Sequence, residues 1–207
     1  MTPTQSALTA AFWSWLAPRA DRLPELADGE APFWDDVLAQ LKAIDDGLWL
    51  EISSGNPEPR ELVLTASGDP DLFDLVDAIC AEALPLPGWR VVSLKPAMGF
   101  DFALTWEGVE IDPKTTWFEP LTLGDAPEIL GLRVAVPGYD AEADEPFHMG
   151  VLVLLDSALG EREAASSIHL VEVVAPPPDP DAAGYLPMVD LGAFLAWRRK
   201  RAARQVH

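Results

Sequence analysis

Apolar side chains recur every three or four residues in four stretches of the chain, and this spacing is typical of one face of a helix. The stretches are residues 6–17, 31–44, 69–83 and 190–205. In the second stretch, Pro32 suits a first helical turn, and Phe33, Val37 and Leu41 fall on one side. Each stretch therefore predicts a helix that packs one face on a core.

Shorter apolar runs between Gly, Pro and Asn residues predict strands. They cover residues 48–52, 61–66, 89–94, 102–106, 115–121, 132–136 and 168–174. Ser54-Gly55-Asn56-Pro57 separates the first two runs and has the composition of a turn, so these runs are expected to form a hairpin. Residues 175–184 are rich in Pro and Asp and predict an extended connector.

Residues 144–159 fit two structures. Val151, Leu152, Leu155 and Leu159 have helical spacing, whereas Gly-Val-Leu-Val-Leu-Leu from Gly150 would also form a buried strand. Gly160 after Ala-Leu is typical of a helix C-terminus, so we favour the helix.

The order of these elements predicts an α+β fold with a largely antiparallel sheet covered by helices. We expect a single domain over residues 1–190, followed by a C-terminal helix over residues 191–207 with a basic end. A chain of 207 residues with eight tryptophans is long enough for one sizeable core.

Charge is divided unequally along the chain. All 34 acidic residues lie at or before Asp190, whereas five of the 14 basic residues lie between Arg198 and Arg204. Residues 1–197 carry a net charge of −25, and the last ten residues carry +5. Such an acidic body repels nucleic-acid phosphates and anionic membranes and attracts cationic partners. A genome-wide compositional bias would also produce this acidity, and both explanations stay open.

The location of the protein follows from what its sequence lacks. One cysteine, Cys80, permits no intramolecular disulfide, and the first residues lack the basic and apolar regions of a secretory signal. The longest apolar window, Gly150 to Leu155, is too short to span a bilayer. We therefore expect a cytoplasmic protein with neither nucleic acid nor membrane as partner.

Three segments resemble an uncharacterised family of bacterial proteins. They are Gly47–Ala66 with Asp69–Trp89, then Lys95-Pro96-Ala97-Met98-Gly99-Phe100-Asp101-Phe102, and finally Leu154-Leu155-Asp156-Ser157-Ala158-Leu159-Gly160-Glu161 with the strand after it. The resemblance covers about two-thirds of the chain, from Phe33 to Val174. It implies an α+β fold and a bacterial origin, and it assigns no catalytic residue.

The segment from Lys95 to Phe102 is the first candidate site. An irregular loop at a strand end lets the backbone approach a ligand, and Lys95 and Asp101 would face an anion and a cation. The simpler interpretation is a tight turn in which Gly99 has a positive φ and Asp101 binds the backbone.

Further acid–base candidates are Asp156, Glu161 and His148. The two carboxylates would converge only if the chain turns at Gly160, and the simpler interpretation is that Asp156 binds a loop while Glu161 is solvated. His148 lies three residues after Glu145, where an ion pair is the simpler interpretation. The three histidines have no zinc-ligand spacing, so no metal and no cofactor is expected.

Motifs for nucleophilic or nucleotide chemistry are absent from the sequence. It contains neither Gly-x-Ser-x-Gly nor a glycine-rich phosphate loop, and Cys80 lies on the apolar face of a predicted helix.

Two tryptophans among carboxylates predict a binding surface. Trp106 and Trp117 lie in predicted strands with Glu107, Glu110, Asp112 and Glu119 around them. Tryptophan side chains are frequent anchors of protein interfaces, and carboxylates steer basic partners. The alternative is a pair of core aromatics beside solvated acids.

These observations lead us to expect a non-catalytic, acidic protein-binding module, such as an immunity protein that masks a basic toxin. One alternative is an enzyme of unrecognised type with a site built from Lys95, Asp101, Asp156 and Glu161. Another is a regulatory or scaffold subunit. The basic C-terminal segment is expected to dock on the acidic body or to be solvated.

Overall fold

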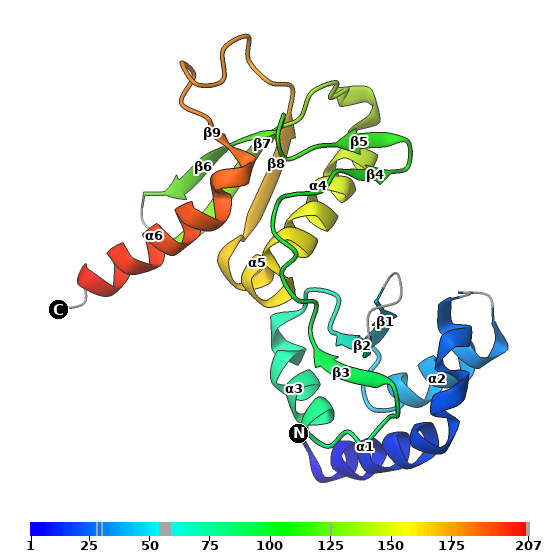
Figure 1. Ribbon diagram of the computed structural model, residues 1–207. Helices are drawn as coiled ribbons and strands as arrows, with labels where there is room; N and C mark the ends of the chain where they lie inside the picture. Colours follow the sequence, from blue (N-terminus) through cyan, green and yellow to red (C-terminus); the bar gives the residue numbers. More distant parts are fainter. Residues whose placement is uncertain (28, 30, 54–58, 125, 206–207) are drawn as a thin grey trace. The chain divides into compact units, whose positions relative to one another are not determined.

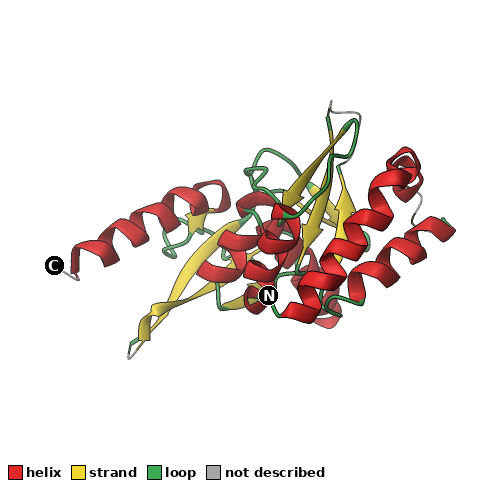
Figure 2. Ribbon diagram, turned by 90° about the horizontal axis from the view of Figure 1, so that it is seen from below, coloured by secondary structure: helices red, strands yellow, loops and turns green. Residues whose placement is uncertain are grey.

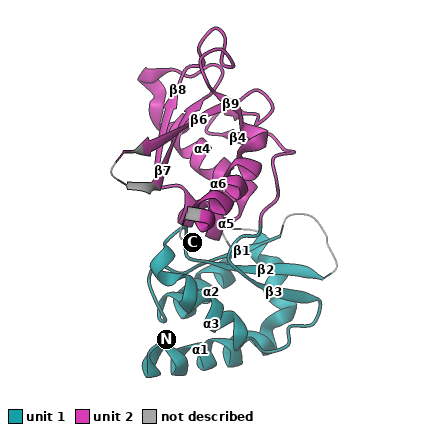
Figure 3. Ribbon diagram, turned by 90° about the vertical axis from the view of Figure 1, so that its left-hand side faces the viewer, with its two compact units in different colours: residues 1–96 teal, residues 97–207 magenta. Residues whose placement is uncertain are grey.

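The computed structural model describes residues 1–27, 29, 31–53, 59–124 and 126–205. The chain forms two compact units, residues 1–96 (unit 1) and residues 97–207 (unit 2), which Figure 3 distinguishes by colour. The predicted division into a domain over 1–190 and a terminal helix stays a prediction. Among the described residues, no helix combines the length and the apolar character that crossing a bilayer requires.

Unit 1 begins with two helices and a 3₁₀ segment between them. Helix α1 spans Pro3–Leu16, the 3₁₀ segment η1 spans Ala17–Ala27, and helix α2 spans Pro32–Lys42. Thr2 and Gln5 form a capping box that fixes the start of α1. The Trp13 indole Nε1–H donates to the Ile79 carbonyl oxygen at 2.8 Å, which attaches α1 to a later helix of the unit.

The sheet of unit 1 has three strands in the order β1-β2-β3. Strand β1 (Trp49–Ile52) pairs antiparallel with β2 (Arg60–Thr65), as the hairpin prediction requires. Strand β3 (Trp89–Ser93) pairs parallel with β2, after a crossover through the 3₁₀ turn η2 (Pro70–Leu72) and helix α3 (Phe73–Ala81). The predicted turn at residues 54–57 lies outside the described residues.

Unit 2 contains a two-stranded and a four-stranded sheet (Figures 1 and 2). The first pairs β4 (Leu104–Trp106) with β5 (Val109–Ile111). The second has the order β8-β7-β6-β9, from β6 (Trp117–Leu123), β7 (Ala126–Ala135), β8 (Leu170–Val174) and β9 (Leu186–Pro187). Strands β6 and β7 are antiparallel, and β7 and β8 are parallel.

Helices of unit 2 connect and cover this sheet. The 3₁₀ turn η3 (Ala141–Ala143) leads into α4 (Asp144–Leu159), and α5 (Glu161–Ser167) follows at once. The 3₁₀ turn η4 (Met188–Asp190) leads into α6 (Leu191–Gln205). The helix prediction for residues 144–159 is confirmed, and Gly160 ends that helix with a φ of 80°.

The core of unit 2 lies between one face of the four-stranded sheet and helices α4 and α6. Phe118, Leu132 and Val134 contribute the sheet side, and Leu154 and Leu195 contribute helical side chains. The predicted α+β class with a C-terminal helix is confirmed. Four of the six strand pairings in the described residues are antiparallel, and the strands are distributed over three small sheets.

Candidate protein-binding surface

The loop at the start of unit 2 closes the end of helix α4. The Met98 N–H donates to the Ser157 carbonyl oxygen at 2.9 Å, and the Gly99 N–H donates to the Ala158 carbonyl oxygen at 3.0 Å. The last carbonyls of a helix have no partner within the helix, so the loop satisfies two of them. Gly99 has a φ of 77°, as the tight-turn interpretation requires.

The charged candidates of this segment have partners within their own units. In unit 1, Lys95 Nζ lies 3.3 Å from Glu51 Oε1. In unit 2, Asp101 has 91% of its side chain exposed, and its Oδ1 lies 2.7 Å from Lys114 Nζ. The hydrogen bond from Lys114 lowers the pKa of Asp101. Asp101 therefore binds a side chain rather than the backbone, contrary to the turn prediction.

The remaining acid–base candidates lie on α4 and α5. Asp156 and His148 are half-buried on α4, and Glu161 in the first turn of α5 is fully buried. The prediction that Glu161 is solvated was wrong, because the chain turns at Gly160 and directs this side chain inward. Asp156 and Glu161 both interact with other groups of the chain.

Metal-binding geometry is not found in the described part of the chain. There, no group of three or more His, Cys, Asp and Glu side chains is placed to hold an ion. His169 binds the backbone of strand β7, since its Nδ1 accepts a hydrogen bond from the Leu130 N–H at 3.3 Å. His207 lies outside the described residues.

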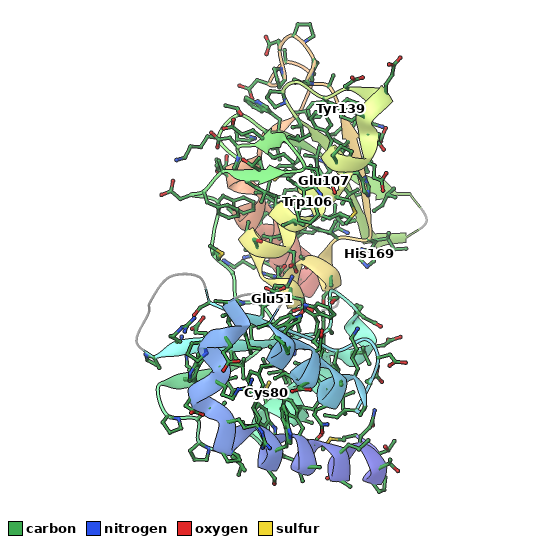
Figure 4. All side chains as sticks on the ribbon, turned by 90° about the vertical axis from the view of Figure 1, so that its right-hand side faces the viewer. Glu51, Cys80, Trp106, Glu107, Tyr139 and His169 are labelled. Carbon is green, nitrogen blue, oxygen red and sulfur yellow. The ribbon has the colours of Figure 1, made fainter. Side chains whose placement is uncertain are left out.

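Cys80 lies on helix α3 in unit 1 (Figure 4). Burial, together with the nearby charge of Asp77, raises the pKa of its thiol to about 12, although Ser93 opposes the shift. A thiol with this pKa is almost entirely protonated at neutral pH and is a poor nucleophile.

Strands β4 and β5 form a hairpin that carries the first predicted tryptophan (Figure 4). Its turn is Glu107-Gly108, with φ values of 47° and 85°. Trp106 pairs with Val109, and Trp106 is half-buried because its face of the hairpin packs on α4 beside Gly150. Glu107 and Glu110 are exposed.

Asp112, also a predicted binding residue, shapes the turn after β5. Its Oδ1 accepts from the Lys114 N–H at 2.9 Å, and its carbonyl oxygen accepts from the Thr116 hydroxyl at 2.8 Å. This half-buried carboxylate therefore holds the backbone that leads into β6.

Trp117 and Glu119 lie on the face of the four-stranded sheet that is opposite Phe118, because side chains alternate along a strand. We call this the outer face. It comprises Trp117, Glu119, Leu121, Arg133, Leu170 and Glu172, which the strand register places in adjacent rows. Leu170 is 60% exposed. The outer face thus combines apolar and charged side chains that reach solvent.

A row of three charges crosses the outer face. Arg133 Nη1 lies 2.8 Å from Glu119 Oε2, and Arg133 Nε lies 2.9 Å from Glu172 Oε2. Tyr185, from the segment before β9, lies beside this row. Burial raises the pKa of its phenol, Glu119 raises the pKa further, and Arg133 opposes the shift. The row has one cation and two carboxylates, so it is net acidic.

Sequence reasoning identified Trp117 and Glu119 but missed Arg133, Glu172 and Tyr185. A signal for Glu172 was present, since Leu-Val-Glu-Val-Val interrupts an apolar strand with one carboxylate. Its pairing with Arg133 depends on the register of β7 and β8, which residue spacing along the chain does not encode.

Every basic side chain of unit 1 is engaged within that unit. Four of the six lie over aromatic rings, namely Arg19 on Trp15, Arg22 on Phe33, Lys42 on Trp49 and Arg60 on Trp89. The other two, Arg90 and Lys95, pair with Glu61 and Glu51. Unit 1 has sixteen acidic residues against these six, so its unneutralised surface charge is negative.

Comparison with known proteins assigns no family, because no family model, no curated protein and no solved structure matches this chain.

Proposed function

We propose that this protein is a non-catalytic binding module whose acidic surface takes a basic protein as partner. The observation that carries the proposal is the internal engagement of the cations of unit 1, either by aromatic rings or by carboxylates. These contacts hold the cations within the unit without cancelling their charge, and the excess of sixteen acidic residues over six basic ones leaves a negative surface that attracts a basic partner from solution.

The outer face supplies the kind of contact that such a partner needs. Trp117 and Leu170 offer apolar area, and Glu119 and Glu172, which share the single guanidinium of Arg133, leave a net negative charge between them. Protein interfaces commonly combine an aromatic anchor with charges that guide association. Glu107 and Glu110 add exposed negative charge on the β4–β5 hairpin.

Affinity capture tests this proposal. The tagged 207-residue chain is exposed to a lysate of its own cells at about 0.05 M and about 0.5 M salt, which changes the screening length about threefold. The proposal requires a stoichiometric, basic protein that is retained at the lower salt concentration and weakened at the higher one. An eluate without such a protein would contradict the proposal.

Two variants then test the surface with the captured partner. Glu107→Gln with Glu110→Gln removes two exposed charges and is expected to slow association about two- to tenfold. The matched control, Asp74→Asn with Glu82→Gln, makes the same charge change at exposed positions of unit 1. Trp117→Ala is expected to weaken affinity by about tenfold or more. Equal effects of hairpin and control variants would indicate that only net charge matters.

A further inference from the structure

Helix α6 presents a basic and aromatic face to solvent. Leu191 and Leu195 of this helix are buried in the core of unit 2. The part of the helix that follows Leu195 carries Trp197, Lys200, Arg201 and Arg204, which we call the α6 patch, and the Trp197 ring also contacts the Phe194 ring. All four are exposed, Trp197 by 53%, and the Arg201 guanidinium lies 5.5 Å from the centre of the Trp197 ring.

The other basic residues of α6 are engaged within the unit. Arg199 pairs with Glu163 of α5, and Arg198 also has an interaction partner. By contrast, Lys200, Arg201 and Arg204 have no carboxylate within ion-pair distance among the described residues. Figure 1 shows the C-terminal half of α6 extending away from the four-stranded sheet. The α6 patch is thus a cluster of cations that its own unit does not neutralise.

Helix-dipole compensation explains only part of this cluster. Cations stabilise the C-terminal end of a helix, but the effect falls off within the last turn. Arg204 lies in that turn, whereas Trp197, Lys200 and Arg201 precede it. An exposed tryptophan beside cations that no carboxylate pairs offers another molecule both an aromatic anchor and positive charge.

We infer that the α6 patch binds the acidic surface of a second copy of this chain. Charge complementarity selects this occupant, because residues 1–197 of each copy carry a net charge of −25 against the +5 of the last ten residues. Such a contact joins two different surfaces, so it forms either twice in a reciprocal two-fold dimer or once at each step of a head-to-tail assembly. At physiological salt the Debye length is about 8 Å, so repulsion between the two bodies is largely screened while direct ion pairs persist.

Sedimentation equilibrium of the 207-residue chain tests this inference. We expect reversible, concentration-dependent association near physiological salt. Replacing the three cations by Lys200→Gln, Arg201→Gln and Arg204→Gln is expected to weaken it by about tenfold or more, as is Trp197→Ala. The matched control, Thr4→Glu with Ala11→Glu and Gln40→Glu, gives the same net charge through exposed positions of unit 1 and is expected to associate like the wild type.

Two outcomes would overturn the inference. One is a protein that stays monomeric at all concentrations, and the other is association that the patch variants and the control weaken equally. Binding to phosphatidylserine-containing vesicles through the same side chains, by a chain that does not self-associate, would replace the second copy by an anionic membrane. None of these results says whether a basic partner is captured from the lysate. The self-association inference and the proposed function can therefore be contradicted independently.

Discussion

The backbone N–H of Met98 donates a hydrogen bond to the carbonyl oxygen of Ser157, 59 residues later in the chain. Met98 belongs to the loop that opens unit 2, and Ser157 belongs to the last turn of α4. The segments of both residues were singled out from the sequence as candidate sites. Their hydrogen bond shows that this loop has a structural task, which is to close the end of a helix.

Gly99→Ala tests the importance of that loop. Gly99 has a φ of 77°, and a Cβ there would meet no atom within 4 Å, so the cost arises from the backbone alone. We expect the free energy of unfolding to fall by about 1–2 kcal/mol, measured by chemical denaturation. Gly124→Ala is the control, since its Cβ also meets no atom within 4 Å but its φ lies outside the left-handed range. Equal losses in the two variants would contradict this explanation.

Gly150→Ala tests the packing of the β4–β5 hairpin on α4. The new Cβ would lie 2.7 Å from Ile111 Cδ1 and 3.3 Å from Trp106 Cβ. Overpacking costs about 1–3 kcal/mol and exceeds the helix-propensity gain of about 1 kcal/mol, so we expect net destabilisation. In an Ile111→Val background, the loss of unfolding free energy caused by Gly150→Ala is expected to be smaller, because the Cδ1 methyl group of Ile111 is absent. A double-mutant cycle without coupling would contradict this account.

Glu107→Asn tests the turn of the same hairpin. Both turn residues have positive φ, a conformation that asparagine tolerates better than glutamate. We expect the unfolding free energy to rise by about 0.5–1 kcal/mol. The control Glu110→Asn removes the same charge from a strand position, where asparagine is unfavourable, and it is expected to be neutral or destabilising. Stabilisation by both variants would point to charge relief instead.

Arg199→Gln tests the ion pair between α5 and α6. Burial would raise the pKa of Glu163, but hydrogen bonds from Ser167 and Arg199 lower it below its ordinary value of 4.5. A carboxylate with a lowered pKa stabilises the fold above its unfolded-state pKa, and this contribution is lost as the pH falls through the folded-state pKa. In Arg199→Gln we expect a higher Glu163 pKa by carboxyl NMR and a smaller loss of stability on acidification. Lys200→Gln removes the same charge from the same helix and should leave the Glu163 titration unchanged.

Much of the fold could be predicted because its signals are local. The spacing of Val151, Leu155 and Leu159, with Gly160 as a terminator, was sufficient for α4. The 3₁₀ segment η1 was missed, although Ala20, Leu23 and Leu26 are buried at every third position, which is the 3₁₀ repeat. Strand β9 has only two residues and leaves no periodic signal.

The candidate surface could be predicted only in part. Trp117 and Glu119 are two residues apart in a strand, so their common face follows from the alternation of side chains. Trp106, by contrast, packs against α4, and this contact depends on the absence of a side chain at Gly150. The Arg133–Glu172 pair depends on the parallel register of β7 and β8, which are distant in the sequence. Both are tertiary relationships that no local pattern carries.

The position of α6 in the core has a consequence for protein synthesis. Unit 1 has all its strands and helices within the first 96 residues, so this unit can fold while the rest of the chain is still being translated. Unit 2 cannot complete its core in the same way, because Phe118 packs against Phe194, which is translated 76 residues later. Until then the apolar side of β6 lacks the cover that Phe194 provides, and exposed apolar strand surface of this kind is prone to aggregation.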